Sequence, residues 1–235
     1  TLYSILKHIN KPSMNILTAE DPVEYELEGI GQVHVREDIG YTFASALRSF
    51  LRQDPEVILV GEIRDKETVD IALKASLTGH LVFSTIHTND APSTITRLQN
   101  MGTPNYLIAA ALTLIMAQRL ARKTCSECKV IDENITPKLL NSIGFLPEQS
   151  ARAKIYKGKG CDQCNQSGYK GRMGIYEILE VTKELKQGVL SNLQQTELEA
   201  IAKKGGFRTM QTMGHDLLLS GDLSFAEFQR VLTVQ

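Results

Sequence analysis

An apolar run of four residues, VILV at 57–60, constrains the fold more than any other stretch of this sequence. A strand with no polar side chain on either face is typical of the centre of a parallel sheet. After Gly61, Asp65 stands as N-cap before the helical pattern KETVDIALKASLTG, and the apolar run HLVFSTIH follows. Because a strand, a helix and a strand in this order imply a right-handed parallel crossover, the sequence predicts an α/β fold.

Two further strands are predicted upstream, MNILT at 14–18 and QVHV at 32–35, and we expect the first to lie in the same sheet as 57–61. Between them and the apolar strand, residues 42–53 have the apolar spacing of a helix, with Thr42 as N-cap. Residues 90–120 predict two helices separated at MGTP. The apolar run 106–117 is interpreted as a core helix, because it is shorter than the roughly 20 residues that cross a bilayer.

The second half of the chain has a different character, with lysines, glycines and cysteines in an irregular pattern from residue 125 onward. GIYEIL at 174–179 predicts a short strand, and only helices are expected after it. Two capping boxes mark helix starts, Thr196 with Glu199 and Ser224 with Glu227. We therefore predict three regions: an α/β core at 1–122, a cysteine-containing subdomain at 123–172, and a strand with helices at 173–235.

Charge limits the kind of partner, because a net charge of −1 over 235 residues gives no electrostatic footprint for nucleic acid. The chain begins with TLYSILKHIN, which has the apolar pattern of an amphipathic helix but no helix-start signal. We expect that upstream sequence is missing.

All four cysteines fall into two pairs with two-residue spacers, Cys125 with Cys128 and Cys161 with Cys164. Two such knuckles supply the four thiolates of a closed structural zinc site, which leaves no position for a substrate. Disulfides or a redox CxxC are the alternatives. The gap between the pairs leaves room for a small helix that begins with Thr136 as cap and Pro137 at its first position.

Carboxylates follow two of the predicted strands. Glu20, Asp21 and Glu24 belong to the acidic segment EDPVEYELE, and Glu62 follows the apolar strand. Ligands bind at the carboxyl ends of strands in open α/β sheets, so these acids are candidates to hold a hydrated Mg²⁺ and to activate a water. A solvated acidic loop is the alternative.

Histidines and arginines add candidates to this region. His80 and His87 bracket a predicted buried strand, and we expect both near the same rim of the sheet. Arg48 and Arg52 are one helical turn apart and are either ordinary surface residues or a pair directed at phosphate oxygens.

Four ordered motifs, ILTAEDPVEY, LRQDPEVILVGEIRDKETVDIALKASLTGHLVFSTIHTNDA, the paired CxxC knuckles and GRMGIYEIL, resemble the assembly ATPases of type II secretion and type IV pili. The similarity covers essentially the whole chain. By this resemblance EDPVE corresponds to the aspartate box, ILVGEIRD to the Walker B strand and TGHLVFSTIHT to the histidine box. The retraction ATPases share these three motifs but generally lack the knuckles, so the knuckles favour the assembly or secretion branch.

The resemblance implies a RecA-like parallel-sheet ATPase core and ATP hydrolysis in a homo-hexamer. Glu62 then supports the Mg²⁺ of bound ATP, Glu24 polarises the attacking water, and His87 senses the γ-phosphate. Arg48 and Arg52 complete a neighbouring subunit's site. Glu20 is a further catalytic candidate, and Asp21 and His80 are further candidates for nucleotide contact. The implied location is cytoplasmic and peripheral to the inner membrane, on the platform proteins of a pilus or secretion machine.

One departure from the family is the phosphate-binding loop, because no G-x-x-x-x-G-K-[ST] occurs in the sequence. The chain resembles a fragment cut just past its own phosphate site, without the first strand of the sheet. We expect this chain alone to be inactive, with the edges of strands 14–18 and 57–61 left unpaired. The alternative function is an interaction module built on the zinc site, in which the α/β part is a scaffold without nucleotide chemistry.

Overall fold

A computed structural model describes residues 1–233 and divides the chain into two compact units. Unit 1 comprises residues 1–115 and 180–205, and unit 2 comprises residues 116–179 and the chain from 206 onward. Each unit is therefore discontinuous in sequence. The predicted boundaries near 122 and 173 divide the chain into consecutive segments, whereas each compact unit combines two separate segments. The division into three functional regions stays a prediction.

Unit 1 contains a parallel sheet of four strands in the order β2-β1-β3-β4. β1 is Ile16–Glu20, β2 is Gly31–His34, β3 is Val57–Val60 and β4 is Leu81–Ser84. The predicted α/β class is confirmed, as is the expectation that the first strand lies in the same sheet as the apolar one. The predicted unpaired edges are wrong, because β1 and β3 pair with each other in the centre and the outer strands are β2 and β4.

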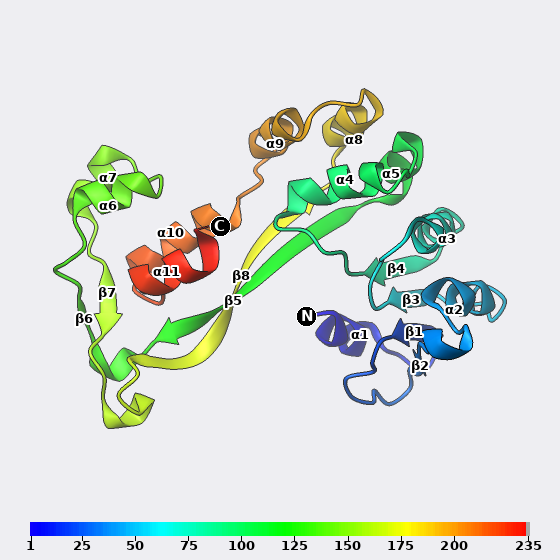
Figure 1. Cartoon of the computed structure of the whole chain (residues 1–235), viewed down its shortest axis with the longest axis horizontal. Coiled ribbons are helices and arrows are strands. Elements are labelled where there is room, and N and C mark those ends of the chain that lie inside the picture. The colour runs from blue at the N-terminus through cyan, green and yellow to red at the C-terminus, as the bar shows by residue number, and fades with distance from the viewer. Residues whose placement is uncertain (234–235) are drawn as a thin grey trace. The chain divides into compact units, whose positions relative to one another are not determined.

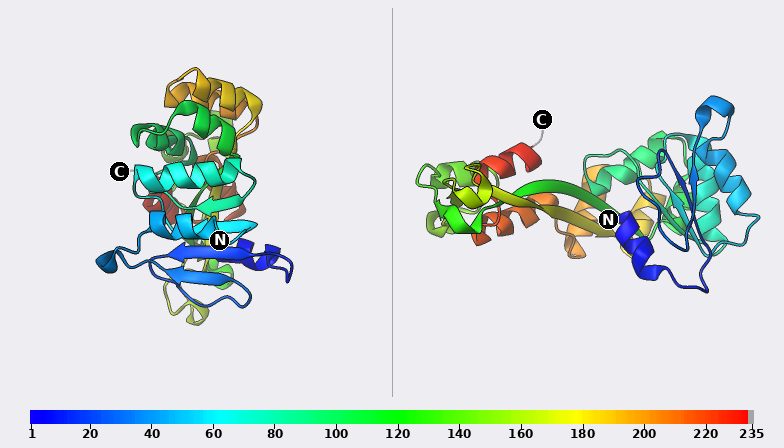
Figure 2. Two further views of the ribbon diagram at one scale, coloured as in Figure 1. Left: turned by 90° about the vertical axis from the view of Figure 1, so that its right-hand side faces the viewer. Right: turned by 90° about the horizontal axis from the view of Figure 1, so that it is seen from below.

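Both faces of β3 are buried, as its uniformly apolar sequence predicts. Ile58 and Val60 pack against α2 (Phe43–Phe50) and α3 (Lys66–Leu77), whereas Val57 and Leu59 contribute to the core beneath α1 (Leu2–Ile9). Figure 1 shows α1 on one side of the strands and α2 and α3 on the other, and the right-hand view in Figure 2, seen from below, agrees. The sheet is thus the middle layer of three.

Two predicted helix starts of this unit, at Thr42 and Asp65, are confirmed. Thr42 accepts a hydrogen bond from the Ser45 N–H at 3.2 Å, and Asp65 accepts one from the Thr68 N–H at 2.8 Å. α2 ends at Phe50, short of the predicted end at residue 53. These caps fix where each helix leaves the carboxyl edge of the sheet.

The remaining helices of unit 1 are α4 (Ala91–Asn100), α5 (Asn105–Ala111), α8 (Lys183–Leu190) and α9 (Gln195–Lys204). α8 packs on α5, and α9 packs on α4. The predicted capping box of Thr196 and Glu199 is wrong, since the N-cap of α9 is Gln194, two residues earlier, and the Glu197 carboxylate accepts from the Gln194 N–H at 2.8 Å.

The predicted core helix over 106–117 is also wrong beyond its first half. α5 ends at Ala111, and the chain continues as β5 (Leu114–Thr124), which pairs with β8 (Tyr169–Glu180). A short apolar run does not by itself distinguish a helix from a strand, and here the partner strand decides.

Unit 2 contains most of β5 and β8 and a separate antiparallel pair formed by β6 (Lys129–Ile131) and β7 (Tyr156–Gly158). Its helices are α6 (Pro137–Ser142), α7 (Pro147–Arg152), α10 (Met210–Ser220) and α11 (Phe225–Leu232). Short 3-10 helices are η1 (Glu37–Ile39) in unit 1 and η2 (Ser126–Cys128) and η3 (Asp162–Cys164) in unit 2. After β8 the described chain is helical, as predicted.

Two predicted caps of unit 2 are found. Thr136 accepts from the Leu139 N–H at 3.4 Å at the start of α6, and Ser224 accepts from the Glu227 N–H at 3.3 Å at the start of α11. The capping box of Ser224 and Glu227 lacks its second hydrogen bond, because the Glu227 carboxylate binds Arg122 and Arg230 instead of the Ser224 N–H.

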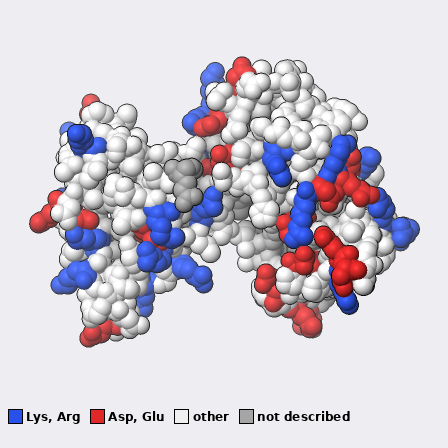
Figure 3. Space-filling model, viewed as in Figure 1, with Lys and Arg blue, Asp and Glu red and all other residues white. Residues whose placement is uncertain are grey.

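Among residues 1–233 no helix combines the length and the apolar character needed to cross a membrane. Figure 3 shows basic and acidic side chains interspersed over unit 1, in keeping with the balanced net charge.

Candidate functional site

The carboxyl ends of β1 and β3 approach each other closely at Gly61. Its N–H donates to the Ala19 carbonyl at 2.7 Å, and a Cβ at this position would lie 3.1 Å from that oxygen and 3.2 Å from the Glu20 Cα. A side chain would therefore push the strands apart at the point where their acidic residues emerge. Thr85 adds a further tie, because its hydroxyl donates to the Gly61 carbonyl at 2.6 Å.

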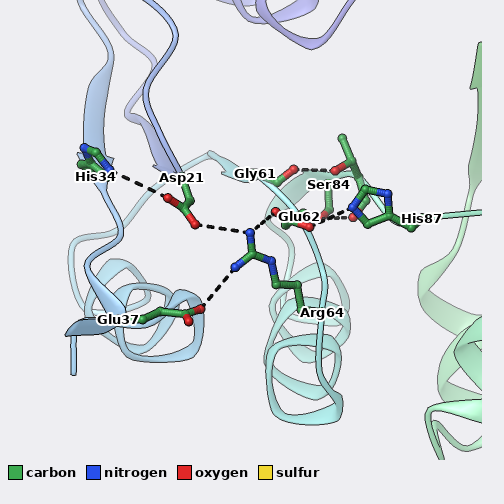
Figure 4. Close-up of polar contacts among 9 residues, drawn as sticks. Asp21, His34, Glu37, Gly61, Glu62, Arg64, Ser84 and His87 are labelled. Atoms are coloured by element: carbon green, nitrogen blue, oxygen red, sulfur yellow. Dashed lines mark hydrogen bonds and ion pairs between the residues drawn. The ribbon is translucent and has the colours of Figure 1, made fainter. Parts of the chain in front are cut away.

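Glu62 lies directly beyond this contact and has a partner on each carboxylate oxygen. Its Oε1 accepts from the Arg64 guanidinium at 2.5 Å, and its Oε2 lies 3.1 Å from Nε2 of His87, which follows β4 (Figure 4). The Glu62 side chain is 19% exposed and that of His87 is 88% exposed. The hydrogen bond from Arg64 is the main reason why the pKa of Glu62 is lowered, and His87 adds to it against the opposing effect of burial. The carboxylate is thus held ionised at an open edge.

Arg64 joins acids from three separate segments. Besides Glu62, its guanidinium lies 3.3 Å from Oδ2 of Asp21 and 3.5 Å from Oε1 of Glu37, as Figure 4 shows. Asp21 also lies 3.9 Å from Nε2 of His34. Sequence reasoning assigned no role to Arg64. The available signal was its position two residues after Glu62, which places both side chains on the same side of an extended segment.

The two glutamates of the aspartate box lie in different surroundings. Glu20 ends β1 and is 5% exposed, with hydrogen bonds from the side chains of Tyr3, Thr18 and Gln32. Glu24 is exposed in the following loop, where its backbone N–H donates to the Tyr3 hydroxyl at 3.2 Å. Only the second carboxylate is freely accessible from solvent.

Three further predicted site residues also lie apart from the cluster around Arg64. His80 precedes β4, at the opposite edge of the sheet from His87, and its Nδ1 lies 2.9 Å from the Ala75 carbonyl near the end of α3. The expectation of one shared rim is wrong, because the two ends of a parallel strand lie at opposite edges. β4 is also only partly buried. Arg48 pairs with Glu67, and Arg52 donates to the Arg48 carbonyl at 2.8 Å at the end of α2.

In unit 2 the four cysteine sulfurs converge, and all lie within 4.8 Å of one another. The Cys125–Cys161 and Cys128–Cys164 sulfur separations are both 3.9 Å, and that of Cys161–Cys164 is 3.7 Å. Four sulfurs at the Zn–S bond length of a tetrahedral site lie about 3.8 Å apart. All four cysteines are free thiols rather than disulfides. The spacing and the donor set therefore fit a tetrathiolate metal site.

The polypeptide around this cluster already favours a thiolate at one position. Burial opposes ionisation of Cys164, yet hydrogen bonds from the backbone N–H groups of Cys161 and Gly168 lower its pKa to about 6. Burial raises the pKa of Cys128 to about 11 and also raises that of Cys161. A divalent cation bound here would release the protons of the neighbouring neutral thiols, so that all four cysteines would bind it as thiolates.

Comparison with protein families matches residues 1–230 to the family described as type II/IV secretion system protein. Among curated proteins, the chain is 47% identical over 227 residues to the type IV pilus assembly ATPase PilB of Myxococcus xanthus, covering 97% of the chain and 40% of that protein. It is 46% identical over 231 residues to the putative type II secretion system protein E of Escherichia coli, covering 98% of the chain and 46% of that protein. The chain therefore spans less than half the length of these relatives.

Among solved structures, the pilus retraction motor PilT with bound ADP superimposes with a TM-score of 0.70 and 29% identity, over 98% of the chain and 56% of that structure. The ATPase DotB of Legionella pneumophila superimposes with a TM-score of 0.66 at 21% identity, over 97% of the chain and 55% of that structure, and supports the fold alone.

Proposed function

This chain belongs to the family of type II/IV secretion system proteins, and we propose that it is part of an ATP-hydrolysing hexameric motor that drives type IV pilus assembly or type II protein secretion. The observation that carries the proposal is the convergence of Glu62, Asp21 and His87 at the carboxyl edge of the parallel sheet. In sheets of this type, ligands bind at that edge.

The donor set of this edge fits a magnesium nucleotide, because Glu62 and Asp21 offer the carboxylate oxygens that Mg²⁺ prefers. Mg²⁺ in this position would neutralise phosphate charge and order its bound waters. His87 is the exposed partner of Glu62, and we assign it contact with the γ-phosphate region. Arg64 keeps the carboxylates that follow two strands together.

Glu24 is assigned the role of general base. It is exposed in the loop that continues from Asp21, so its carboxylate is free to approach a water beside the nucleotide. Glu20 is less suited to this role, because hydrogen bonds from Tyr3, Thr18 and Gln32 already occupy its buried carboxylate.

Arg48 lies on the exposed surface of α2 and Arg52 is exposed just beyond its end, and we assign both to the site of a neighbouring subunit in the hexamer. A guanidinium from an adjacent subunit suits a triphosphate through its bidentate geometry. We further propose that the motor is cytoplasmic and attaches to the inner membrane through platform proteins of the machine it drives.

Zinc is the ion proposed for Cys125, Cys128, Cys161 and Cys164. Four sulfur ligands at tetrahedral spacing favour Zn²⁺ over hard cations, and a closed site of this kind stabilises structure without catalysing a reaction.

The test uses the full-length protein that carries this chain. Glu24→Gln should abolish turnover and largely spare ATP binding, because it removes the base and keeps the shape of the side chain. Glu62→Gln should weaken magnesium-dependent binding and turnover together. Glu26→Gln, an exposed glutamate of the same loop, is the matched control and should leave both unchanged. Normal turnover in Glu24→Gln would refute the assignment of the base, and absence of any turnover in the unaltered protein would favour the scaffold alternative.

A further inference from the structure

The loop at residues 21–28 presents an electrostatic problem for a catalytic base. Its acidic side chains are exposed and carry like charges, so they repel one another. Of the residues at 21–28, only Leu27 is buried, at 6% exposed. Apolar packing therefore contributes little to placing the loop, and its position has to be fixed through other contacts. The acidic members are Asp21, Glu24, Glu26 and Glu28.

Arg64 binds Asp21 at the start of the loop, and the Asn10 side chain donates to the Glu28 carbonyl at 2.8 Å at its end. The contacts to the middle of the loop come from two other side chains. The Tyr3 hydroxyl, from α1, donates to Oε2 of the buried Glu20 and accepts from the Glu24 N–H at 3.2 Å. The Tyr3 ring also meets the Tyr25 ring edge-on, with centroids 4.7 Å apart. One phenol thus connects a helix, the end of β1 and the backbone of the proposed base.

Gln32 of β2 supplies a second set of hydrogen bonds to the loop. Its amide nitrogen lies 3.2 Å from Oε1 of Glu20, 3.3 Å from the Tyr3 hydroxyl and 3.3 Å from the Tyr25 carbonyl. Its amide oxygen accepts from the Leu27 N–H at 2.6 Å. Tyr3 and Gln32 therefore bind three backbone groups in the middle of the loop, and both side chains also bind Glu20.

We propose that Tyr3 and Gln32 are positioning residues that use the buried Glu20 carboxylate as an anchor to hold the Glu24 loop in its catalytic place. The inference rests on the proposed role of Glu24. It gives Glu20 a structural role, since a carboxylate bound by three side chains within the fold is a fixed acceptor and not a mobile base. It also couples α1 to the base, because the Tyr3 hydroxyl binds the Glu24 backbone directly.

Tyr3→Phe tests this, because it removes one oxygen and keeps the ring that packs on Tyr25. Hydrogen exchange of the Glu24 amide should accelerate by about fivefold, the effect of losing one hydrogen bond. In the full-length protein, kcat should fall while KM for magnesium ATP stays close to the unaltered value, since the base is displaced but the binding groups remain. Gln32→Met should accelerate exchange at Leu27 and lower kcat in the same way.

Tyr25→Phe is the matched control, because it removes a hydroxyl from the same aromatic pair and leaves the network intact. Its loop exchange and kcat should both match those of the unaltered protein. Amides of β3 report on the fold, and they should stay protected in all three variants. If Tyr3→Phe loses that protection, Gln32→Met provides the test.

Loop positioning by Tyr3 and Gln32 and ATP hydrolysis by the full-length protein have separate readouts. Unchanged exchange at Glu24 and Leu27 in the two variants would overturn the inference whatever the activity. Faster exchange with unchanged kcat would also overturn it, because the loop would then not need to be held. No turnover in the unaltered protein would overturn the proposed function and the catalytic consequence, whereas exchange would still decide whether Tyr3 and Gln32 hold the loop.

Discussion

Glu62 and His87 lie 3.1 Å apart, Oε2 to Nε2, although they follow two different strands of the sheet. The pair exists because β3 and β4 are parallel neighbours in register, with Val60 opposite Ser84, so that both strands deliver the residues that follow them to one edge. His80, which stands before β4, lies at the other edge. The two histidines therefore make a matched pair for experiment.

His87→Gln in the full-length protein should lower ATP turnover by roughly 10-fold or more, as expected when a group that contacts the reacting phosphate is removed. His80→Gln should leave turnover unchanged and lower stability by about 1 kcal/mol, because it disturbs only contacts at the end of α3. Steady-state kinetics and thermal unfolding measure the two effects. Equal losses of turnover would contradict this division of roles.

Arg64→Gln should raise the pKa of Glu62 toward its ordinary value of 4.5, because the guanidinium hydrogen bond is the main cause of the lowered value. A carboxylate with a lowered pKa stabilises the fold above its unfolded pKa, and that contribution is lost as the pH falls through the lower folded value. The variant should lose this acid-range stability. Carbon-detected NMR titration of the carboxyl group reads the pKa directly. Arg36→Gln, which breaks only the exposed pair with Asp38, should leave the Glu62 titration in place.

The purified protein should contain one zinc per chain, measured by elemental analysis. Cys125→Ser should lose most of the metal and loosen the segment around the cysteines, because three thiolates leave the site open. Hydrogen exchange should show the loss in unit 2 and unchanged protection in the sheet of unit 1. Ser126→Ala, at the adjacent position, should retain the metal. Two disulfides in the mass spectrum would refute the site.

Glu227→Gln should destabilise unit 2 by about 3 kcal/mol, because Glu227 is fully buried and binds the guanidinium groups of Arg122 and Arg230. Burial opposes its ionisation, yet these hydrogen bonds lower its pKa from 4.5 to about 2. Its stabilising effect is therefore complete above about pH 4.5 and is lost as the pH falls toward 2. Hydrogen exchange of the α11 amides between about pH 4.5 and 2 measures this loss of stability. Glu148→Gln, on the exposed surface of α7, should have little effect.

The sequence alone determined much of unit 1. The apolar residues at 57–60 required a strand buried on both faces, and Asp65 and Gly79 marked where its following helix begins and ends. These signals are local, since burial pattern and capping chemistry act over a few residues. The cysteine pairs were equally informative, because a two-residue spacer already brings two sulfurs toward one point.

Tertiary structure decided what depends on distant partners. Residues 112–117 are apolar enough for a helix, yet the chain there turns into β5, whose partner β8 lies more than 40 residues further along. Arg64 became the centre of the acidic cluster only because Asp21 and Glu37, from other segments, reach its guanidinium. Glu20 and Glu24 look equivalent in sequence, but burial beside Tyr3 and Gln32 separates an anchored carboxylate from an exposed one. The sequence supplied the residue types and their spacing, whereas the packing of the chain fixed which charges meet and which stay in water.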